Sequence, residues 1–249
     1  MKFALVDNEK VEAAKGLKGV CPICQESVIP KCGQYKINHW AHKSIAHCDK
    51  WWESETDWHR NWKNLFPKEW QEIVAYDEKT GEKHIADIKT SSDLVVEFQH
   101  SHISNEERIS REEFYKNMVW VVDGTRRKRD FDKFCQNLNS FSLSYIPRTC
   151  LYVVKHGIYN IPREWQQSKV PVLFDFRDWL GLDQDDQRRK PLWCLLPTRK
   201  IDNSLLVFLV ISREDFVDAV KKNALSIDYK LLMHGIKEAK LIPISIRKE

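Results

Sequence analysis

The chain of 249 residues lacks the long hydrophobic runs and short catalytic signatures that would classify it at once. No segment holds about 18 consecutive apolar residues, which excludes a membrane-spanning helix. The apolar run Phe3–Val6 is too short for a signal peptide, so we expect a cytoplasmic protein with no membrane partner. We find no internal repeat, no glycine-rich phosphate loop and no Ser-His-Asp arrangement, which argues against repeat proteins, P-loop enzymes and serine hydrolases.

A strong charge bias is also absent. The net charge is only +4, which permits nucleic-acid binding but does not argue for it. Hydrophobic residues make up 42% of the chain and charged residues 31%, as in globular rather than disordered proteins. The length fits one large domain or two small ones. Tryptophan is abundant, with ten residues, and we expect most of them to be core or interface anchors and some to stack on bases.

Seven cysteines in a cytoplasmic protein are expected to be reduced, which favours metal binding over disulfides. A Cys-x-x-Cys turn points two thiolates at one centre, and a later pair of imidazoles completes a tetrahedron that suits zinc. The predicted zinc ligands are Cys21, Cys24, His39 and His42. Cys32 or Cys48 is an alternative for one of these four, and a thiol redox pair or unrelated side chains are alternatives to the metal. Four protein ligands leave no open position, so the zinc would be structural.

Residues 51–66 have the apolar spacing of a helix, with one face formed by Trp51, Trp58, Trp62 and Leu65. Glu55, His59 and Lys63 are spaced by four residues, so we expect them to line a neighbouring stripe. For this helix alone, a solvated stripe with local ion pairs is the simpler interpretation. The strands that follow make the stripe part of a candidate site.

Three strands are predicted over 70–76, 84–88 and 94–99. Asp87 and Glu97 both lie among apolar residues of these strands, where a buried carboxylate is costly unless something positive meets it. Two carboxylates on adjacent strand ends can share one divalent cation, and magnesium prefers such oxygen ligands. The alternative is a half-exposed sheet on which both side chains face solvent.

The rest of the chain continues the pattern of an α/β protein. A helix over 105–117 and a buried strand over 118–122 follow, and helices on both faces of a mixed sheet would explain the apolar strands. The densest basic run, Thr125–Arg129, either contacts phosphate or is the solvated start of a helix. Further strands are predicted at 151–154, 172–176, 192–196 and 205–211, and a helix at 214–223.

Five motifs in order carry a resemblance to a known family. They are Cys-Pro-Ile-Cys (21–24), His-Trp-Ala-His (39–42), Glu-Thr-Asp-Trp-His-Arg-Asn-Trp-Lys (55–63), His-Ile-Ala-Asp-Ile (84–88) and Val-Glu-Phe-Gln-His-Ser (96–101). Together with the strand at 119–122 they resemble the competence protein CoiA family over residues 18–124. The C-terminal half shows no such motif.

The resemblance implies a restriction-endonuclease-like core of the PD-(D/E)xK superfamily, which is a mixed sheet flanked by helices. In that pattern Asp87 and Glu97 are metal ligands, Glu55 is a carboxylate contributed by the preceding helix, and Gln99 takes the lysine position. The resemblance also implies Mg²⁺ or Mn²⁺ as the catalytic cofactor and DNA as the partner. The pathway implied is DNA uptake and recombination, or phage defence, in which similar modules occur.

Gln99 departs from the superfamily pattern, because lysine there would orient the attacking water or stabilise the developing charge. Glutamine can hydrogen-bond that water but brings no charge. We hypothesise that Lys63 or His59 supplies the missing cation or proton transfer, since both are expected on the stripe with Glu55.

The sequence therefore predicts a metal-dependent deoxyribonuclease in three parts: a zinc subdomain at 1–50, a nuclease-like core at 51–145 and an α+β region of unknown role at 146–249. The catalytic residues would come from the stripe and from the strands. Two alternatives stay open. One is an inactive nuclease fold that binds DNA or recruits a partner, and the other is a zinc-containing subunit that binds a protein partner or its own copy through the C-terminal region.

Overall fold

The computed structural model describes residues 1–34, 36–43, 48–53, 55–138, 143–145, 151–155, 161–177, 186–197, 205–225 and 242–243. The chain divides into two compact units, Met1–Ser101 and His102–Glu249. Among the helices in this described part of the chain, none combines the length and apolar character that a membrane span needs. The three-domain division expected from sequence stays a prediction.

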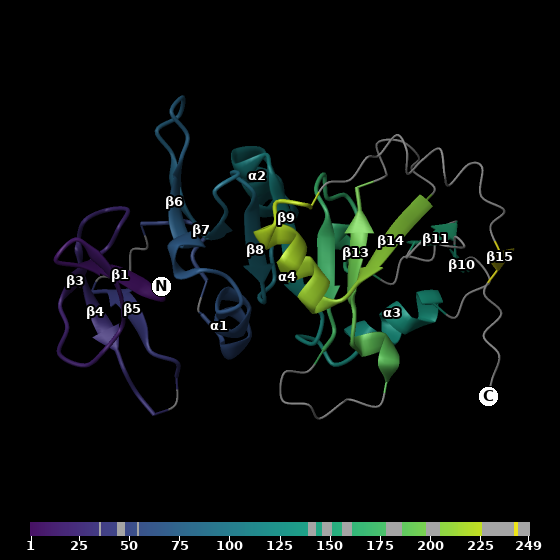
Figure 1. Ribbon diagram of the computed structural model, residues 1–249, viewed down its shortest axis with the longest axis horizontal. Helices are drawn as coiled ribbons and strands as arrows, with labels where there is room; N and C mark the ends of the chain where they lie inside the picture. The colour runs from purple at the N-terminus through teal and green to yellow at the C-terminus, as the bar shows by residue number, and fades with distance from the viewer. Residues whose placement is uncertain are drawn as a thin grey trace. The chain divides into compact units, whose positions relative to one another are not determined.

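The first unit begins with a five-stranded antiparallel sheet in the order β2-β1-β3-β4-β5 (Figure 1). Its strands are β1 (Phe3–Val6), β2 (Glu9–Glu12), β3 (Gly19–Val20), β4 (Ser27–Lys31) and β5 (His39–His42). Asp7 and Asn8 both have positive φ, as a type I′ hairpin turn requires, and this turn joins β1 to β2. The small core of the sheet centres on Trp40, which is fully buried and donates its indole N–H to the Val11 carbonyl oxygen.

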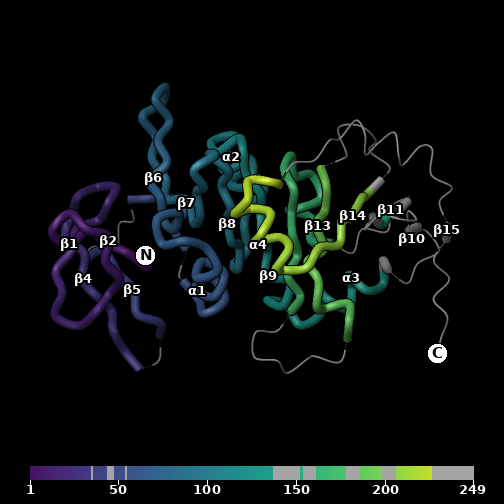
Figure 2. The backbone as a smooth tube through the Cα atoms, viewed as in Figure 1, coloured from purple at the N-terminus to yellow at the C-terminus, as the bar shows by residue number. Residues whose placement is uncertain are grey.

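The same unit continues with an antiparallel meander of three strands, β6 (Gln71–Tyr76), β7 (Lys83–Lys89) and β8 (Val95–Gln99). Helix α1 (Asp57–Lys63), labelled in Figure 2, precedes it, as does the short 3-10 turn η1 (Lys68–Trp70). α1 packs on β8, where the Trp62 ring stacks on Phe98 with centroids 5.6 Å apart. This packing fixes the side chains of α1 against the strand that carries Glu97.

Helix α1 is shorter than the sequence predicts. It begins at Asp57 because the Thr56 hydroxyl accepts a hydrogen bond from the His59 backbone N–H, which is an N-cap. Glu55 therefore precedes the helix, and the prediction that it shares a helical stripe with His59 and Lys63 is wrong. The solvated stripe is also wrong, since His59 and Lys63 are buried, at 4% and 5% exposure.

The second unit has a mixed sheet in the order β15-β10-β11-β14-β13-β12-β9. β9 pairs with β12 in parallel and the other pairs are antiparallel. The strands are β9 (Met118–Asp123), β10 (Leu143–Tyr145), β11 (Leu151–Lys155), β12 (Val172–Asp175), β13 (Leu192–Leu196), β14 (Leu205–Ile211) and β15 (Ile242–Pro243). The helices are α2 (Asn105–Tyr115), α3 (Asp130–Leu138) and α4 (Arg213–Lys221), with 3-10 turns η2 (Arg163–Trp165) and η3 (Gln187–Arg189).

Two helices of this unit cover opposite faces of its sheet. Phe134 of α3 packs against Phe174 of β12, whereas Arg213 of α4 forms an ion pair with Asp175, the next residue of that strand. Because successive side chains of a strand point to opposite faces, α3 and α4 lie on opposite sides. The predicted α/β fold class, a mixed sheet flanked by helices, is confirmed.

Candidate functional site

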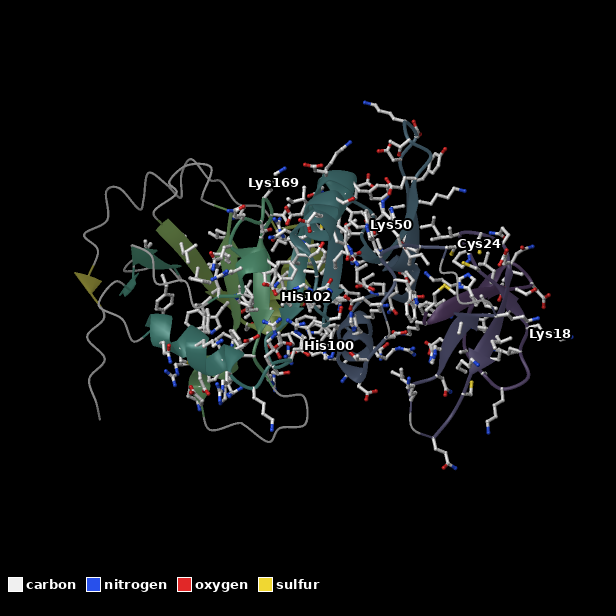
Figure 3. All side chains as sticks on the ribbon, turned by 180° about the vertical axis from the view of Figure 1, so that it is seen from behind. Lys18, Cys24, Lys50, His100, His102 and Lys169 are labelled. Atoms are coloured by element: carbon white, nitrogen blue, oxygen red, sulfur yellow. The ribbon has the colours of Figure 1, made fainter. Side chains whose placement is uncertain are left out.

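Four side chains that could bind a metal gather at the N-terminal sheet, and Figure 3 shows sulfur atoms close to the labelled Cys24. The group is Cys21, Cys24, His42 and Cys48, whose ligand atoms all lie within 4.8 Å of one another. The Cys-x-x-Cys turn follows β3, and there the Ile23 N–H points at the Cys21 sulfur at 3.4 Å. His42 ends β5, so the pairing of β4 with β5 brings its ring to the turn.

The distances in this cluster fit a tetrahedral zinc site. Zinc bonds of about 2.3 Å to sulfur and 2.0–2.1 Å to nitrogen imply ligand separations of roughly 3.5–3.8 Å. Cys21 Sγ is 3.5 Å from Cys48 Sγ, and His42 Nε2 is 3.4 Å from Cys24 Sγ and 3.6 Å from Cys48 Sγ. Burial raises the pKa of the Cys21 and Cys48 thiols.

The cluster differs from the expected ligand set at one position. Cys48, the alternative considered from sequence, belongs to it, whereas His39 does not. The His39 Nδ1–H instead donates to the Ile37 carbonyl oxygen at 2.8 Å. His39 starts β5 and His42 ends it, so their three-residue spacing does not place both rings on one side of the strand.

Asp49, the residue after Cys48, links the cluster to the meander through hydrogen bonds. Its Oδ1 lies 2.8 Å from His84 Nδ1 and accepts the Trp51 N–H at 2.9 Å, while its Oδ2 accepts the Ile85 N–H at 3.0 Å. Burial favours the neutral acid, but these bonds to the carboxylate outweigh it and lower the pKa of Asp49. A carboxylate next to Cys48 thus holds the strand that carries Asp87.

The predicted carboxylates meet where β7 and β8 stop pairing through their backbones. The ladder joins Lys89 to Val95 and Ile88 to Val96. At the next position the Asp87 N–H donates to Glu97 Oε1 at 3.1 Å, and the Phe98 N–H donates to Asp87 Oδ2 at 3.0 Å. Each carboxylate therefore replaces a ladder acceptor and is fixed beside the other. Glu97 is 3% exposed, so it does not face solvent as the alternative required.

Lys63 brings a positive charge from α1 to these carboxylates. Its Nζ lies 2.9 Å from Asp87 Oδ1, 2.9 Å from Glu72 Oε1 and 3.7 Å from Glu55 Oε1. Burial alone would lower the pKa of Lys63, but the three carboxylates raise it well above its usual range. Lys63 is thus a fixed cation at neutral pH and does not act as a proton acceptor there.

His59, one turn before Lys63, is held at both ring nitrogens. Nε2 is 2.6 Å from the Phe98 carbonyl oxygen, which can only accept, so Nε2 carries the proton. Nδ1 lies 3.1 Å from the Thr56 hydroxyl. Burial lowers the pKa of His59, which keeps the ring neutral at pH 7. The ring therefore positions the carbonyl that follows Glu97.

Gln99 is 1% exposed at the end of β8. Its amide N–H group donates to Glu53, which also accepts from the Ser101 hydroxyl at 2.6 Å. Its oxygen Oε1 is buried without a hydrogen-bond partner among the described residues. An unsatisfied buried oxygen is costly, and a water or cation beside it would remove that cost.

Glu55 is engaged differently from the expectation of a free carboxylate ligand. Arg60 holds it in a bidentate ion pair, with N–O distances of 2.9 and 3.0 Å. Its Oε1 is also the oxygen 3.7 Å from Lys63. Glu55 therefore contributes negative charge beside Lys63 and is already paired.

The core carboxylates form a looser set than the cysteines do. Within the described ranges, the Cys/His group is the one set of three or more candidate ligands that meets the 4.8 Å separation. Asp87 and Glu97 supply two oxygen ligands, and Gln99 Oε1 is a third oxygen nearby in sequence. Magnesium keeps several waters and is usually bound through one or two carboxylates, so this donor set fits a hard divalent cation.

Two residues of this site were missed by sequence reasoning. Glu72, in β6, pairs with Lys63 and also accepts the backbone N–H groups of Lys2 and Phe3 at 2.7 and 3.0 Å. It is followed by the apolar residues Ile73 and Val74 of its strand, and that signal could have found it. Glu53 binds Gln99 from an irregular segment, where no periodicity marks it.

Comparison with known proteins finds matches in two segments of the chain. Residues 4–50 match the family model for the competence protein CoiA N-terminal domain, and residues 59–171 match that for the CoiA nuclease-like domain. Searches of curated proteins and of solved structures found no match. The two matches together cover more than half of the sequence, in the order in which the five motifs occur. The chain therefore belongs to the competence protein CoiA family.

Proposed function

We propose that this protein is a metal-dependent nuclease that hydrolyses DNA phosphodiester bonds at the edge of β7 and β8. The observation that carries the proposal is the placement of Asp87 and Glu97 side by side with the Lys63 ammonium 2.9 Å from Asp87. Carboxylates that bind a divalent cation, together with a cation that faces a phosphate, are the parts that phosphodiester hydrolysis needs. The nuclease-like family match supports this reaction class.

Asp87 and Glu97 would hold Mg²⁺ or Mn²⁺. A divalent cation bound there lowers the pKa of a water ligand and offsets charge on the scissile phosphate. The chain's own contribution is to position both carboxylates side by side through the Asp87 and Phe98 backbone amides.

Lys63 supplies the positive charge that Gln99 lacks. Its ion pairs with Asp87 and Glu72 hold the ammonium in place, and its raised pKa keeps it charged at neutral pH. A buried, preorganised ammonium stabilises negative charge that develops on the phosphate oxygens. Glu72 and Glu55 act as positioning residues for Lys63. In this proposal Glu55 holds the Lys63 ammonium in place and is not a ligand of the metal.

The test is cleavage of linear single-stranded and double-stranded DNA with Mg²⁺ or Mn²⁺, by wild type and by the Asp87→Asn/Glu97→Gln double variant. The metal-free control is desalted protein without added Mg²⁺ or Mn²⁺, because EDTA would also remove zinc. Cleavage that needs the metal and disappears in the folded variant supports the proposal. Full metal-dependent activity in the variant would show that the site is misassigned.

A second function is favoured by one observation. Lys63 already neutralises Asp87, and a site filled by its own ammonium could bind DNA without cleaving it. In that case the protein retards DNA on a gel, yields no metal-dependent product, and binds Mn²⁺ no better than the Asp87→Asn/Glu97→Gln variant. Mn²⁺ binding that wild type shows and the variant lacks would exclude this function.

We also propose that zinc bound by Cys21, Cys24, His42 and Cys48 is structural. All four positions of a tetrahedron are then protein ligands, which leaves none for substrate. DNA uptake, recombination or phage defence remains the predicted setting, and cytoplasmic location remains a prediction.

A further inference from the structure

A hollow of about 650 Å³ lies within the second unit, apart from the residues of the proposed catalytic site. Its walls come from the segment His102–Asn105 that opens α2, from the start of α3, and from the turn η2. His102 is the labelled residue of this wall in Figure 3. No role in the proposed reaction has been assigned to any of these residues.

Three segments each contribute a long cation to the hollow, and two of them are neighbours in the sequence. Arg127 comes from the turn after β9, Lys133 from α3 and Arg163 from η2. All three residues are exposed, so their charged ends are accessible to a ligand. Convergence of cations from three segments produces a local positive potential that the small net charge of the chain does not reveal.

The acidic residues of the hollow do not cancel this potential. Glu164 is paired with Arg126, whose guanidinium lies 3.9 Å away, so that carboxylate is already offset. Asp130 is half-buried at the start of α3, and burial raises its pKa although the neighbouring arginines act against this. Arg127, Lys133 and Arg163 thus outnumber the carboxylate that is left.

The lining also indicates which part of a polyanion would bind. Phe, Tyr and Trp are absent from the described residues that line the hollow, so it offers no such ring on which a base could stack. Arginine and lysine side chains are the usual ligands of backbone phosphates, which carry charge and no sequence information. A hollow of this size accommodates more than one phosphate group.

We propose that this hollow binds phosphate groups of a nucleic-acid backbone and is a substrate-holding site separate from the catalytic carboxylates. In this proposal one residue of the basic run Thr125–Arg129, Arg127, binds phosphate. Lys128 and Arg129 do not line the hollow. The inference rests on the proposed function in that the polyanion is taken to be nucleic acid.

The test is the fluorescence anisotropy of labelled single-stranded and double-stranded DNA with the full chain, measured without Mg²⁺ or Mn²⁺ so that cleavage cannot contribute. Arg127→Ala/Lys133→Ala is compared with Lys128→Ala/Arg129→Ala, which removes the same two charges from exposed positions outside the hollow. Circular dichroism confirms that both variants fold. Inorganic phosphate and poly-glutamate serve as competitors that separate phosphate recognition from general attraction to anions.

We expect the hollow variant to weaken binding by about 10-fold or more at 100 mM KCl and to reduce the salt slope by about 1–2. The control variant should change affinity by less than about twofold, and phosphate should compete better than poly-glutamate at equal charge. Equal losses in the two variants, or no loss in the hollow variant, would overturn the site. The expected loss in the hollow variant, found in a protein that shows no metal-dependent cleavage, would instead count against the proposed nuclease activity and leave this inference standing.

Discussion

The first unit holds two candidate metal centres built from opposite kinds of ligand. The Cys/His cluster gathers sulfur and nitrogen atoms 3.4–3.6 Å apart, although thiols gain little from such crowding without a cation. At the β7–β8 edge the ligands are carboxylates, and the ammonium of Lys63 forms an ion pair with Asp87. The first centre offers four protein ligands to a metal, whereas the second places a protein cation beside its carboxylates.

This difference separates the proposed structural role from the proposed catalytic one. A site with four protein ligands contributes its binding energy to folding, because no such site exists in the unfolded chain. A site with two carboxylates and a nearby fixed cation can bind and release a divalent ion while the fold persists. The comparison predicts that removing zinc damages the fold and that removing Mg²⁺ stops only the reaction.

The largest expected effect is on zinc binding. Cys48→Ser should remove zinc and unfold the N-terminal sheet, because structural zinc contributes on the order of 10 kcal/mol. His39→Ala should keep one zinc per chain, since His39 lies outside the cluster. Elemental analysis and thermal unfolding measure both. The comparison fails if His39→Ala loses zinc and Cys48→Ser keeps it.

The stability contributed by the carboxylate centre should decrease at acidic pH, where its carboxylates lose their charge. Burial opposes ionisation of Glu72, but Lys63 and the chain N-terminus lower its pKa from 4.5 to about 2. Because the folded pKa lies below the unfolded one, the stabilisation is present above about pH 4.5 and is lost as pH falls toward 2. The shift corresponds to roughly 3 kcal/mol. Urea unfolding across this range should show a smaller pH slope for Glu72→Gln, and an unchanged slope would contradict the assignment.

A smaller effect on stability is expected at Asp49, which links the Cys/His cluster to the strand that carries Asp87. Asp49→Asn keeps the size of the side chain but removes the charge that bonds His84 and two backbone amides. We expect it to lower the free energy of unfolding by roughly 2 kcal/mol, because hydrogen bonds to charged groups contribute about 1.5–3 kcal/mol. Exposed Asp93 provides the matched control, as Asp93→Asn removes the same charge. Equal changes in the free energy of unfolding for the two substitutions would show that the hydrogen bonds of Asp49 do not stabilise the fold.

The smallest expected effect belongs to His59. His59→Ala should reduce the cleavage rate by about 10-fold through loss of its bond to the Phe98 carbonyl oxygen. The pH–rate profile should keep its shape, because burial lowers the pKa of His59 and the ring is already neutral. Loss of one limb of the profile in His59→Ala would show instead that His59 transfers a proton.

The two centres also differ in how far the sequence predicted them. Cys-x-x-Cys is a local turn, so Cys21 and Cys24 follow from spacing alone, while the choice between His39 and Cys48 depended on where β5 and the next segment end. At the other centre, apolar strand patterns located Asp87 and Glu97.

The ion pairs of the second centre could not be predicted from the periodicity of the sequence. The start of α1 is set by the Thr56 cap, which moved Glu55 off the helix. The pairing of Lys63 with Glu72 depends on which faces of α1 and β6 meet, and no local pattern states that. In the second unit, continuous apolar runs predicted strands such as 192–196 and 205–211, which match β13 and β14 at both ends, whereas the short strands β10 and β15 were not predicted.

The measurement that tests the central claim most directly is the single-turnover rate of DNA cleavage with saturating Mg²⁺ for Lys63→Gln/Glu72→Gln beside Glu72→Gln alone. The double variant removes one cation and one anion together, so that the net charge of the site stays that of the wild type. If Lys63 supplies the cation that Gln99 lacks, the double variant should be about 100- to 1,000-fold slower than Glu72→Gln while remaining folded and zinc-loaded. Equal rates in the two folded variants would contradict the account.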